Sequence, residues 1–471
     1  MKHSIRITFI LVLLLSYFTA NSQILYWALT SKGGQYNAGT IFFTNRYGEE
    51  QQTVHSFEYS NGDSPIGSLI LASDDHLYGT TPGGNIDFGT IFQFNDDNFQ
   101  YKKILEFNGS TEGFHPTGQL VNYTNGHIFG MTRNGGEDQS GVIFEYVPGE
   151  TSITVKKYFT GSDGAHPEGG LIIGSNGLLY GLTSYGGNFN AGVLFSFDPG
   201  TDVYEQLYDF NPANGAIPVC NLLQASNGKL YGITPKGGDF NSGVLFEYDI
   251  ISDTYTKLVD FNGQNAGSEP AGSLIEVWNG ILYGMAMKNE ISGNDSYGTI
   301  YSYDITNYQI NKLFTFDGLN GANPTGSLTK IVDGNLIGLT DKGGTFDAGV
   351  RFEFDVTDNT FIKKLDFEGE NGQLPIYSAL LEVSYLAVNE QSLLQNMSVY
   401  PNPASNFMYL DFKTSVESFE YKVFSMDGTL IDQGHIESNL TRINTHSLQP
   451  GTYLLQVNSD GASVSKKVFI R

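Results

Sequence analysis

The sequence predicts an all-β protein, a seven-bladed β-propeller followed by a small C-terminal β-sandwich. Three observations predict this fold class. With 57 Gly and 13% aromatic residues, helices are disfavoured, because Gly costs about 1 kcal/mol per helical position relative to Ala. A unit of about 51 residues recurs along residues 23–384. From residue 397 the repeats are replaced by alternating strands of another pattern.

The first 22 residues have the pattern of a secretory signal peptide. A basic start precedes an apolar run from Ile7 to Phe18, and small residues lie just before Gln23. A membrane-spanning helix needs about 20 apolar residues, and no later segment of the sequence approaches this length. We therefore expect residues 1–22 to be removed and the mature chain to be exported, with no transmembrane segment.

Two independent sequence markers each count seven repeats. One is a Leu-Tyr-Gly-like tripeptide, and the other is a proline three residues after a glycine. The tripeptide ends at Ala28, Gly79, Gly130, Gly181, Gly232, Gly284 and Gly338, and the prolines are Pro65, Pro116, Pro167, Pro218, Pro270, Pro324 and Pro375. A unit that cannot bury both of its faces alone must stack against its neighbours.

One unit illustrates the expected blade. Short strands are predicted at residues 221–225, 230–234, 243–248 and 254–261, with Asn227-Gly228 as a hairpin turn. The chain enters the repeats at a second strand, Ile24 to Thr30, and leaves them after a first strand, Ser378 to Val383. The last strand is therefore predicted to complete the first blade, which closes the ring and removes its exposed ends.

The repeat resembles two known layouts. It is similar to kelch repeats in its double glycine after the second strand, but it lacks the kelch tryptophan of the fourth strand. It resembles more closely the GloVer tandem repeat of bacterial surface proteins, in units such as LYGLTSYGGNFNAGVLF at residues 179–195. This resemblance covers residues 24 to about 385, and it implies no defined activity.

Residues 385–396 are predicted to be a linker, and residues 397–471 a small β-sandwich. Four ordered features resemble the C-terminal sorting domain of type IX secretion cargo: a Tyr-Pro-Asn-Pro segment, an Asp-Gly turn, a Pro-Gly-x-Tyr strand and a basic finish. Their main residues are Tyr400, Pro401, Asn402, Pro403, Gly451, Tyr453, Lys466 and Lys467. The resemblance implies the type IX machinery as partner, passage through the periplasm and across the outer membrane, and then release or attachment to surface lipopolysaccharide. An ordinary binding sandwich is the alternative.

The repeat region is strongly acidic. Residues 23–392 carry 43 acidic and 17 basic side chains, a net charge of −26. Such a domain repels nucleic acid and anionic membrane surfaces. Solubility outside the cell accounts for this charge, with cation binding as the alternative.

A ligand site is expected on the propeller face that carries the long loops, and departures from the repeat are the best candidates. Residues 285–298 form a longer unit that has lost the double glycine, and they offer Lys288, Glu290 and Asp295. Arg133 and Asp138 mark a second departure. A tolerated surface insertion is the alternative for residues 285–298.

Other polar residues are interpreted structurally. Repeated Asx residues, Asn37, Asp87, Asn190, Asn241 and Asp347 among them, are expected to form turns. Cys220, the single cysteine, is expected to be a buried core residue. His115 and His166 share a pre-proline position, but two ligands without a third are a weak metal site. Neither a metal nor a cofactor is predicted.

No Gly-x-Ser-x-Gly, His-Glu-x-x-His or phosphate-binding Gly-x-x-x-x-Gly-Lys motif occurs, and no catalytic residue is assigned. The sequence favours a non-catalytic binding or adhesion module for an extracellular glycan or protein. A secreted carbohydrate-active enzyme with its site on the long-loop face is the alternative, and a purely structural surface role is a third. Whether the chain has enzymatic activity is left open.

Overall fold

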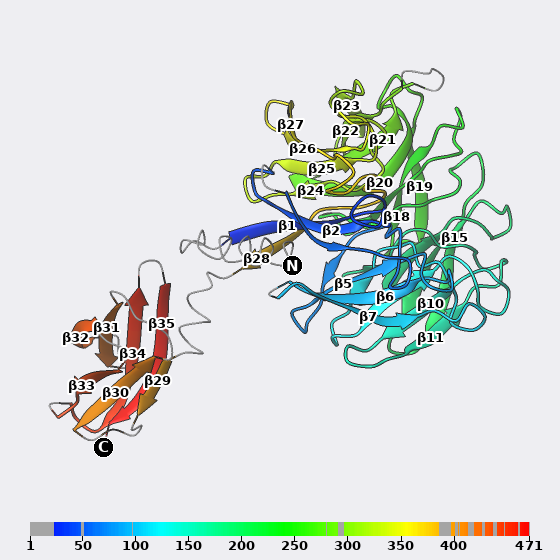
Figure 1. Cartoon of the computed structure of the whole chain (residues 1–471). Helices are drawn as coiled ribbons and strands as arrows, with labels where there is room; N and C mark the ends of the chain where they lie inside the picture. The colour runs from blue at the N-terminus through cyan, green and yellow to red at the C-terminus, as the bar shows by residue number, and fades with distance from the viewer. Residues whose placement is uncertain are drawn as a thin grey trace, which may run out of the picture. The chain divides into compact units, whose positions relative to one another are not determined.

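The computed structural model is shown in Figure 1. It describes residues 23–48, 51–96, 98–278, 280–290, 296–385, 397–400, 404, 406–412, 419–425, 429–436, 440–446, 448–459 and 462–470. The signal peptide expected at residues 1–22 and the linker expected at 385–396, except Tyr385, lie outside these residues. The chain divides into two compact units, with one boundary at Val383/Ser384.

Every regular element in the described residues is a β-strand. The described residues of the N-terminal unit, which contains the repeats, form seven four-stranded sheets. The first has the order β28 (Leu381–Tyr385), β1 (Gln23–Thr30), β2 (Thr40–Asn45) and β3 (Gln51–Ser56). The other six sheets each take four consecutive strands, and their bounds are β4 (Ile70–Leu71), β5 (Leu77–Thr81), β6 (Thr90–Asn95), β7 (Gln100–Glu106); β8 (Val121–Asn122), β9 (Ile128–Thr132), β10 (Val142–Tyr146), β11 (Ile153–Tyr158); β12 (Ile172–Ile173), β13 (Leu179–Thr183), β14 (Val193–Asp198), β15 (Val203–Asp209); β16 (Leu223–Gln224), β17 (Leu230–Thr234), β18 (Val244–Asp249), β19 (Thr254–Asp260); β20 (Ser268–Trp278), β21 (Ile281–Lys288), β22 (Thr299–Asp304), β23 (Gln309–Thr315); β24 (Thr329–Lys330), β25 (Leu336–Thr340), β26 (Val350–Asp355) and β27 (Thr360–Asp366).

The repeat signature follows from how the second and third strands pack. Five of the second strands, such as β13, are buried along their whole length, because neighbouring sheets cover both of their faces. Gly181 in the centre of β13 lies opposite Phe195 of β14. A Cβ on Gly181 would lie 2.5 Å from that ring. The glycines at this position in six of the seven tripeptides thus make room for an aromatic ring from the third strand.

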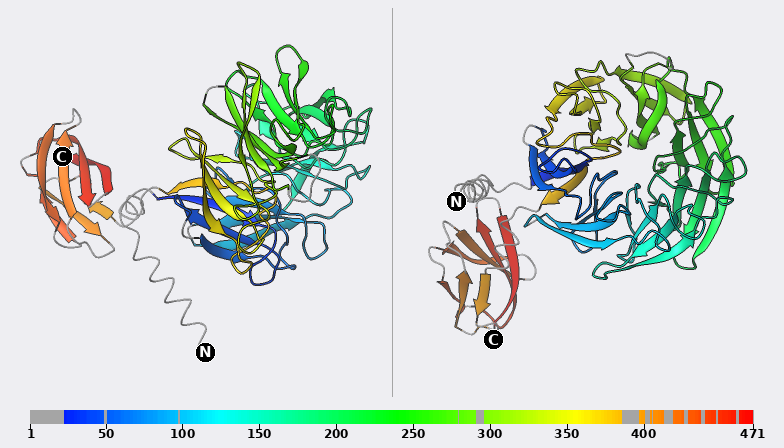
Figure 2. Two further views of the ribbon diagram at one scale, coloured as in Figure 1. Left: turned by 90° about the horizontal axis from the view of Figure 1, so that it is seen from above. Right: turned by 45° about the vertical axis from the view of Figure 1, so that its right-hand side comes forward.

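The sheets follow one another around a common centre, as the right-hand view of Figure 2 shows. Strand β28, from the end of the repeat region, pairs with β1 at its start. Further bonds join the two ends of the repeat region: Ser31 N–H donates to the Leu374 carbonyl at 3.0 Å, and Ala379 N–H donates to Ser68 Oγ at 2.9 Å. These seven sheets fit a β-propeller-like fold.

The sixth sheet departs from the others. Its first strand, β20, spans 11 residues, whereas the first strands of neighbouring sheets span two. β21 has eight residues and continues to Lys288, whereas β5, β9, β13, β17 and β25 have five residues each. β21 ends directly before Asn289 and Glu290, which stand where most other units carry the double glycine.

The C-terminal unit contains two sheets. One has the order β29 (Met397–Tyr400), β30 (Phe407–Phe412) and β33 (Leu440–Asn444), and the other has the order β32 (Leu430–Ile436), β31 (Phe419–Ser425), β34 (Gly451–Ser459) and β35 (Ala462–Ile470). Both sheets contribute to one hydrophobic core, which contains Leu410 and Ile443 from the first and Val423, Leu455 and Val468 from the second.

Candidate binding site on the long-loop face

The loops between second and third strands lie at one end of the sheets, which we call the long-loop face. In four of these loops an Asx oxygen accepts a hydrogen bond from the first glycine of the pair, and the Asx residue has positive φ. The four bonds are Gly33 N to Asn37 Oδ1 at 3.0 Å, Gly186 N to Asn190 Oδ1 at 3.0 Å, Gly237 N to Asn241 Oδ1 at 3.1 Å and Gly343 N to Asp347 Oδ1 at 2.9 Å. The predicted turn role of these residues is confirmed.

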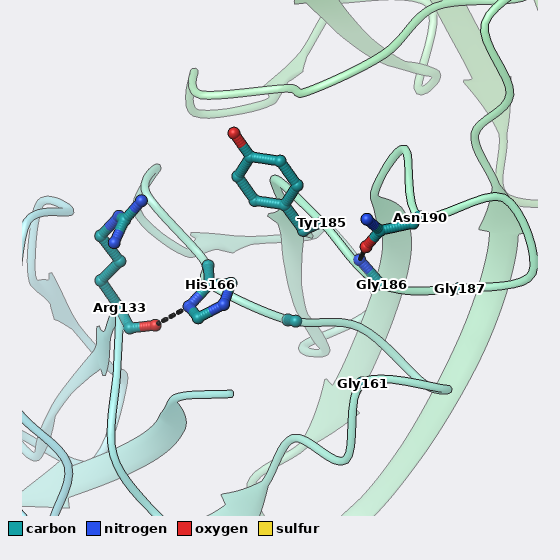
Figure 3. Close-up of a pocket in the computed structure, with 8 residues that line it drawn as sticks. Arg133, Gly161, His166, Tyr185, Gly186, Gly187 and Asn190 are labelled. Carbon is teal, nitrogen blue, oxygen red and sulfur yellow. Dashed lines mark hydrogen bonds between the residues drawn. The ribbon is translucent and has the colours of Figure 1, made fainter. Parts of the chain in front are cut away.

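A pocket of about 480 Å³ opens on this face between the third and fourth sheets. Figure 3 shows its lining residues. Arg133 comes from the β9–β10 loop, His166 from the segment before β12, and Tyr185 and Asn190 from the β13–β14 loop. The remaining lining residues are Gly161, Ala165, Gly186 and Gly187. No Asp or Glu is among these described lining residues, so the pocket offers hydrogen-bonding groups and an aromatic ring rather than carboxylates.

The side chains of the pocket are held in place by neighbouring sheets. Arg133 Nε donates to Glu168 Oε1 at 2.8 Å. His166 Nδ1 lies 3.0 Å from the carbonyl oxygen of Arg133, and because a carbonyl only accepts, Nδ1 is the donor of this bond. Tyr185 packs edge-on against His166, with ring centroids 5.9 Å apart. The pocket is therefore pre-formed.

The centre of the ring is nearly filled by backbone. The position two residues after the repeated proline is Gly in five units, and it is Cys220 and Tyr377 in the others. A Cβ on Gly118 would lie 2.1 Å from the Gly169 carbonyl oxygen. The space left beside Thr117, Glu168 and Tyr377 is about 30 Å³, which accommodates a water or two but not a sugar ring.

A buried carboxyl group lies beside this central space. Asp341 accepts hydrogen bonds from Thr325 Oγ1 at 2.7 Å and from Asn323 Nδ2 at 3.1 Å. Burial raises the pKa of Asp341 to about 7. Burial also raises the pKa of Tyr377 to about 12, and the charges of Glu168 and Asp341 act in the same direction. Both carboxyl groups therefore lie close enough to Tyr377 for their charges to act on its hydroxyl group.

The candidate residues from the sequence lie at different places. Arg133 lines the pocket, and Asp138 is exposed in the same loop. Lys288 Nζ donates to Glu269 Oε1 at 3.0 Å, as does Lys236 Nζ at 2.7 Å. Glu290 is exposed, with its carbonyl accepting from Ser268. Asp295 lies outside the described residues.

Tyr185, Asp341 and Tyr377 were not singled out from the sequence. Each occupies a repeat position that varies between units, and aligning the seven units by those positions would have revealed them. His115 and His166 do share a position with positive φ. Among the described residues no group of three or more His, Cys, Asp or Glu side chains could hold a metal. Cys220 is buried as predicted; burial raises its pKa to about 11, and its S–H donates to the Ile233 carbonyl.

Parts of the expected sorting motif are described. Tyr400 ends β29 and Gly451 begins β34, while Tyr453 donates its hydroxyl to the Gln449 carbonyl at 2.9 Å. Lys466 and Lys467 lie on β35 opposite Leu455 and Leu454. Pro401, Asn402 and Pro403 lie outside the described residues.

Family comparison decides what the repeat is. The Gloeobacter/Verrucomicrobia repeat matches residues 19–225 and 218–386. The chain belongs to the Gloeobacter/Verrucomicrobia repeat family. This confirms the GloVer resemblance; the kelch-like assignment stays a prediction. The tail matches the secretion system C-terminal sorting domain over residues 398–471, which supports type IX secretion and export to the cell surface or outside.

Solved structures support the fold of this Gloeobacter/Verrucomicrobia repeat protein. A candidate 6-phosphogluconolactonase from Bacteroides uniformis matches with a TM-score of 0.52 at 13% identity, over 76% of this chain and 99% of that one. Its counterpart from Bacteroides fragilis matches with a TM-score of 0.52 at 16% identity, over 76% and 98%. At these identities the likeness supports the fold alone.

PorZ, an essential bacterial surface component of the type IX secretion system of Porphyromonas gingivalis, matches with a TM-score of 0.45 at 11% identity, over 92% of this chain. The chain spans 63% of the length of PorZ, and this likeness carries no conclusion. No curated protein matches the chain. In the part of the chain that the structure describes, no helix is long and apolar enough to cross a membrane.

Proposed function

We propose that this chain is an exported, seven-bladed β-propeller that binds an extracellular glycan or protein on its long-loop face without transforming it. Residues 1–22 direct it to the periplasm, and the C-terminal sandwich then takes it through the type IX machinery. The released or surface-attached protein acts as a binding or adhesion module. Its ring closes through β28, which completes the first blade.

One observation carries the non-catalytic role. The pocket with room for a ligand, about 480 Å³, has no carboxylate among its lining residues. The carboxyl group of Glu168 instead lines a central space of about 30 Å³, and that of Asp341 is bonded to Thr325, which lines the same space. A glycoside hydrolase needs two carboxyl groups on either side of a sugar bond. Because the space for a ligand and the carboxyl groups lie at different places, binding is favoured over hydrolysis.

A carbohydrate-active enzyme is the second candidate, and one observation favours it. Asp341, with a pKa raised to about 7, has the protonation behaviour of a general acid, and the charges of Asp341 and Glu168 both act on Tyr377. For this pair to act, the centre of the ring would have to widen enough to admit a sugar.

A glycan array and a pull-down with the mature protein test the proposal. We expect retention of at least one glycan or protein by the wild type and weaker retention by Arg133→Gln and Tyr185→Ala. Lys312→Gln, which changes an exposed residue of the outer strand β23, is the control and should leave retention unchanged. Blank arrays together with blank pull-downs would contradict the proposal, and new reducing ends released from a polysaccharide would favour the enzyme.

A further inference from the structure

Large apolar side chains recur at the tips of the loops on the long-loop face. Each lies directly before the Asx residue of its loop, and each has between 46% and 60% of its surface exposed. These tip residues are Tyr36, Ile86, Phe189, Phe240 and Phe346. Single exposed apolar residues are ordinary, but a set repeated on one face marks an interaction surface.

The tips are held rigidly rather than exposed by chance. In the β13–β14 loop, Gly186 N–H donates to Asn190 Oδ1, and this bond holds the backbone directly after Phe189. On the other side Asn188 N–H donates to Asp209 Oδ1 at 3.1 Å. The loop of Phe240 repeats this arrangement, with Asp239 N–H donating to Asp260 Oδ1 at 2.8 Å. A loop whose backbone is fixed before binding loses little conformational entropy when it meets a ligand.

Cations lie closer to the centre of the same face. Five of the 17 basic residues of the repeat region lie one or two positions before the double glycine, or before the residues that stand in its place. They are Lys32, Arg133, Lys236, Lys288 and Lys342. These are the inner cations. Lys32 Nζ reaches Ser64, and Lys236 Nζ reaches Glu269, each at the pre-proline position of the next sheet. In each sheet the pre-proline residue lies two or three residues before the segment that lines the central space, so these two lysines point toward the centre.

The inner cations are only partly compensated. Lys236 and Lys288 share the single carboxylate of Glu269, which leaves one positive charge over at this point of a region whose net charge is −26. Both ammonium groups remain accessible, with 43% and 44% of the side chains exposed. The mouth of the ring is thus a local site for an anion.

We propose that the ligand of the long-loop face is an acidic polysaccharide, one whose sugars carry carboxylates; this rests on the proposed function and names its ligand class. Such a chain offers both complementary chemistries. The apolar faces of its sugar rings stack on the tip residues, and its carboxylates pair with the inner cations, among them Arg133 in the pocket. A neutral glycan would leave the inner cations unused.

The test is binding of the mature protein to polygalacturonate and to its fully methyl-esterified form, which keeps the sugar chain and removes the charge. We expect the acidic form to bind at least about tenfold more tightly at low salt, and this preference to shrink as salt screens the charges. Lys236→Gln/Lys288→Gln should remove most of the preference, whereas Lys312→Gln on the outer strand should keep it.

The tips are tested with Phe189→Ala and Phe240→Ala. Each should weaken binding about three- to tenfold, the loss of one stacking contact. Ile251→Ala is the matched control, because Ile251 is 94% exposed at the opposite end of β18; it should bind like the wild type. Unchanged melting temperatures show that the variants fold.

The outcomes separate the two proposals. Equal binding of both forms, or binding unchanged by the lysine and tip substitutions, overturns the acidic-polysaccharide inference and leaves the binding function standing. Failure to bind either form, with another glycan or a protein retained on the array or pull-down, also overturns the inference alone. Failure of every glycan and every pull-down overturns both.

Discussion

Arg133 Nε donates to Glu168 Oε1 at 2.8 Å, and this bond joins the β9–β10 loop of one sheet to the entry of the next. The pair separates the two regions of the long-loop face. Arg133 lines the large pocket, and Glu168 lines the narrow central space. The arginine is thus oriented toward the pocket by a carboxylate that the pocket itself does not contain.

Arg133→Gln is expected to weaken binding of the ligand retained on the array by about tenfold, since it removes the one guanidinium of the pocket. Stability should change by less than about 1 kcal/mol, because partly exposed ion pairs contribute little. Affinity by titration and thermal melting measure the two effects. A large loss of stability with unchanged affinity would show that the pair is structural only.

Arg351→Leu is expected to stabilise the N-terminal unit, which contains all the repeats, by about 1–3 kcal/mol. Arg351 is fully buried on β26, and its Nε and Nη1 have no hydrogen-bond partner. The same position in the other six units is a buried Ile or Leu: Ile41, Ile91, Ile143, Leu194, Leu245 and Ile300. Chemical denaturation measures the change, and Arg46→Leu, at a partly exposed arginine, is the control. A destabilised Arg351→Leu would show that the buried charge is needed.

Asp341→Asn is expected to remove a pH dependence of stability. The folded pKa, about 7, is raised above the unfolded value of 3.8, so the folded state binds the proton more tightly. The stabilisation is therefore full below about pH 4 and is lost as pH rises to about 7, by up to about 4 kcal/mol. The variant should melt higher than the wild type at pH 8 and much closer to it at pH 4. Parallel melting profiles across this range would contradict the assignment.

Replacing residues 378–383 by a Gly-Ser stretch of equal length should destabilise the whole ring. The replacement removes Leu380 and Val383 from the core, which costs about 3–6 kcal/mol. It also removes Ser378 Oγ, which accepts from Leu29 N–H at 3.2 Å. The same replacement at residues 388–393 is the control. Protease resistance and melting measure the loss, and equal resistance of the two variants would contradict closure through β28.

The strand order could be predicted because each unit repeats the same local signals. Asn227-Gly228 and Leu230 to Thr234 determine a turn and a strand without reference to distant residues. The pairing of β28 with β1 could be predicted because the strands left over at the two ends are complementary. The short first strands, such as β16, were expected to be longer.

The pocket could not be predicted, because its side chains come from loops of different sheets. Nothing in the residues near Arg133 or Tyr185 indicates that a neighbouring sheet brings His166 between them. The tip residues, in contrast, were detectable. Phe189 and Phe240 directly precede Asx residues already recognised as repeated, but aromatic residues in a β-rich sequence are usually assigned to the core.

The most direct measurement of the central claim is a single experiment on the mature protein with each glycan that the array retains. Binding is measured for the wild type and for Arg133→Gln/Tyr185→Ala, and reducing ends are counted afterwards. We predict binding that the double variant loses, with no new reducing ends. New reducing ends from the wild type, or binding that the double variant keeps, would contradict a non-catalytic site on the long-loop face.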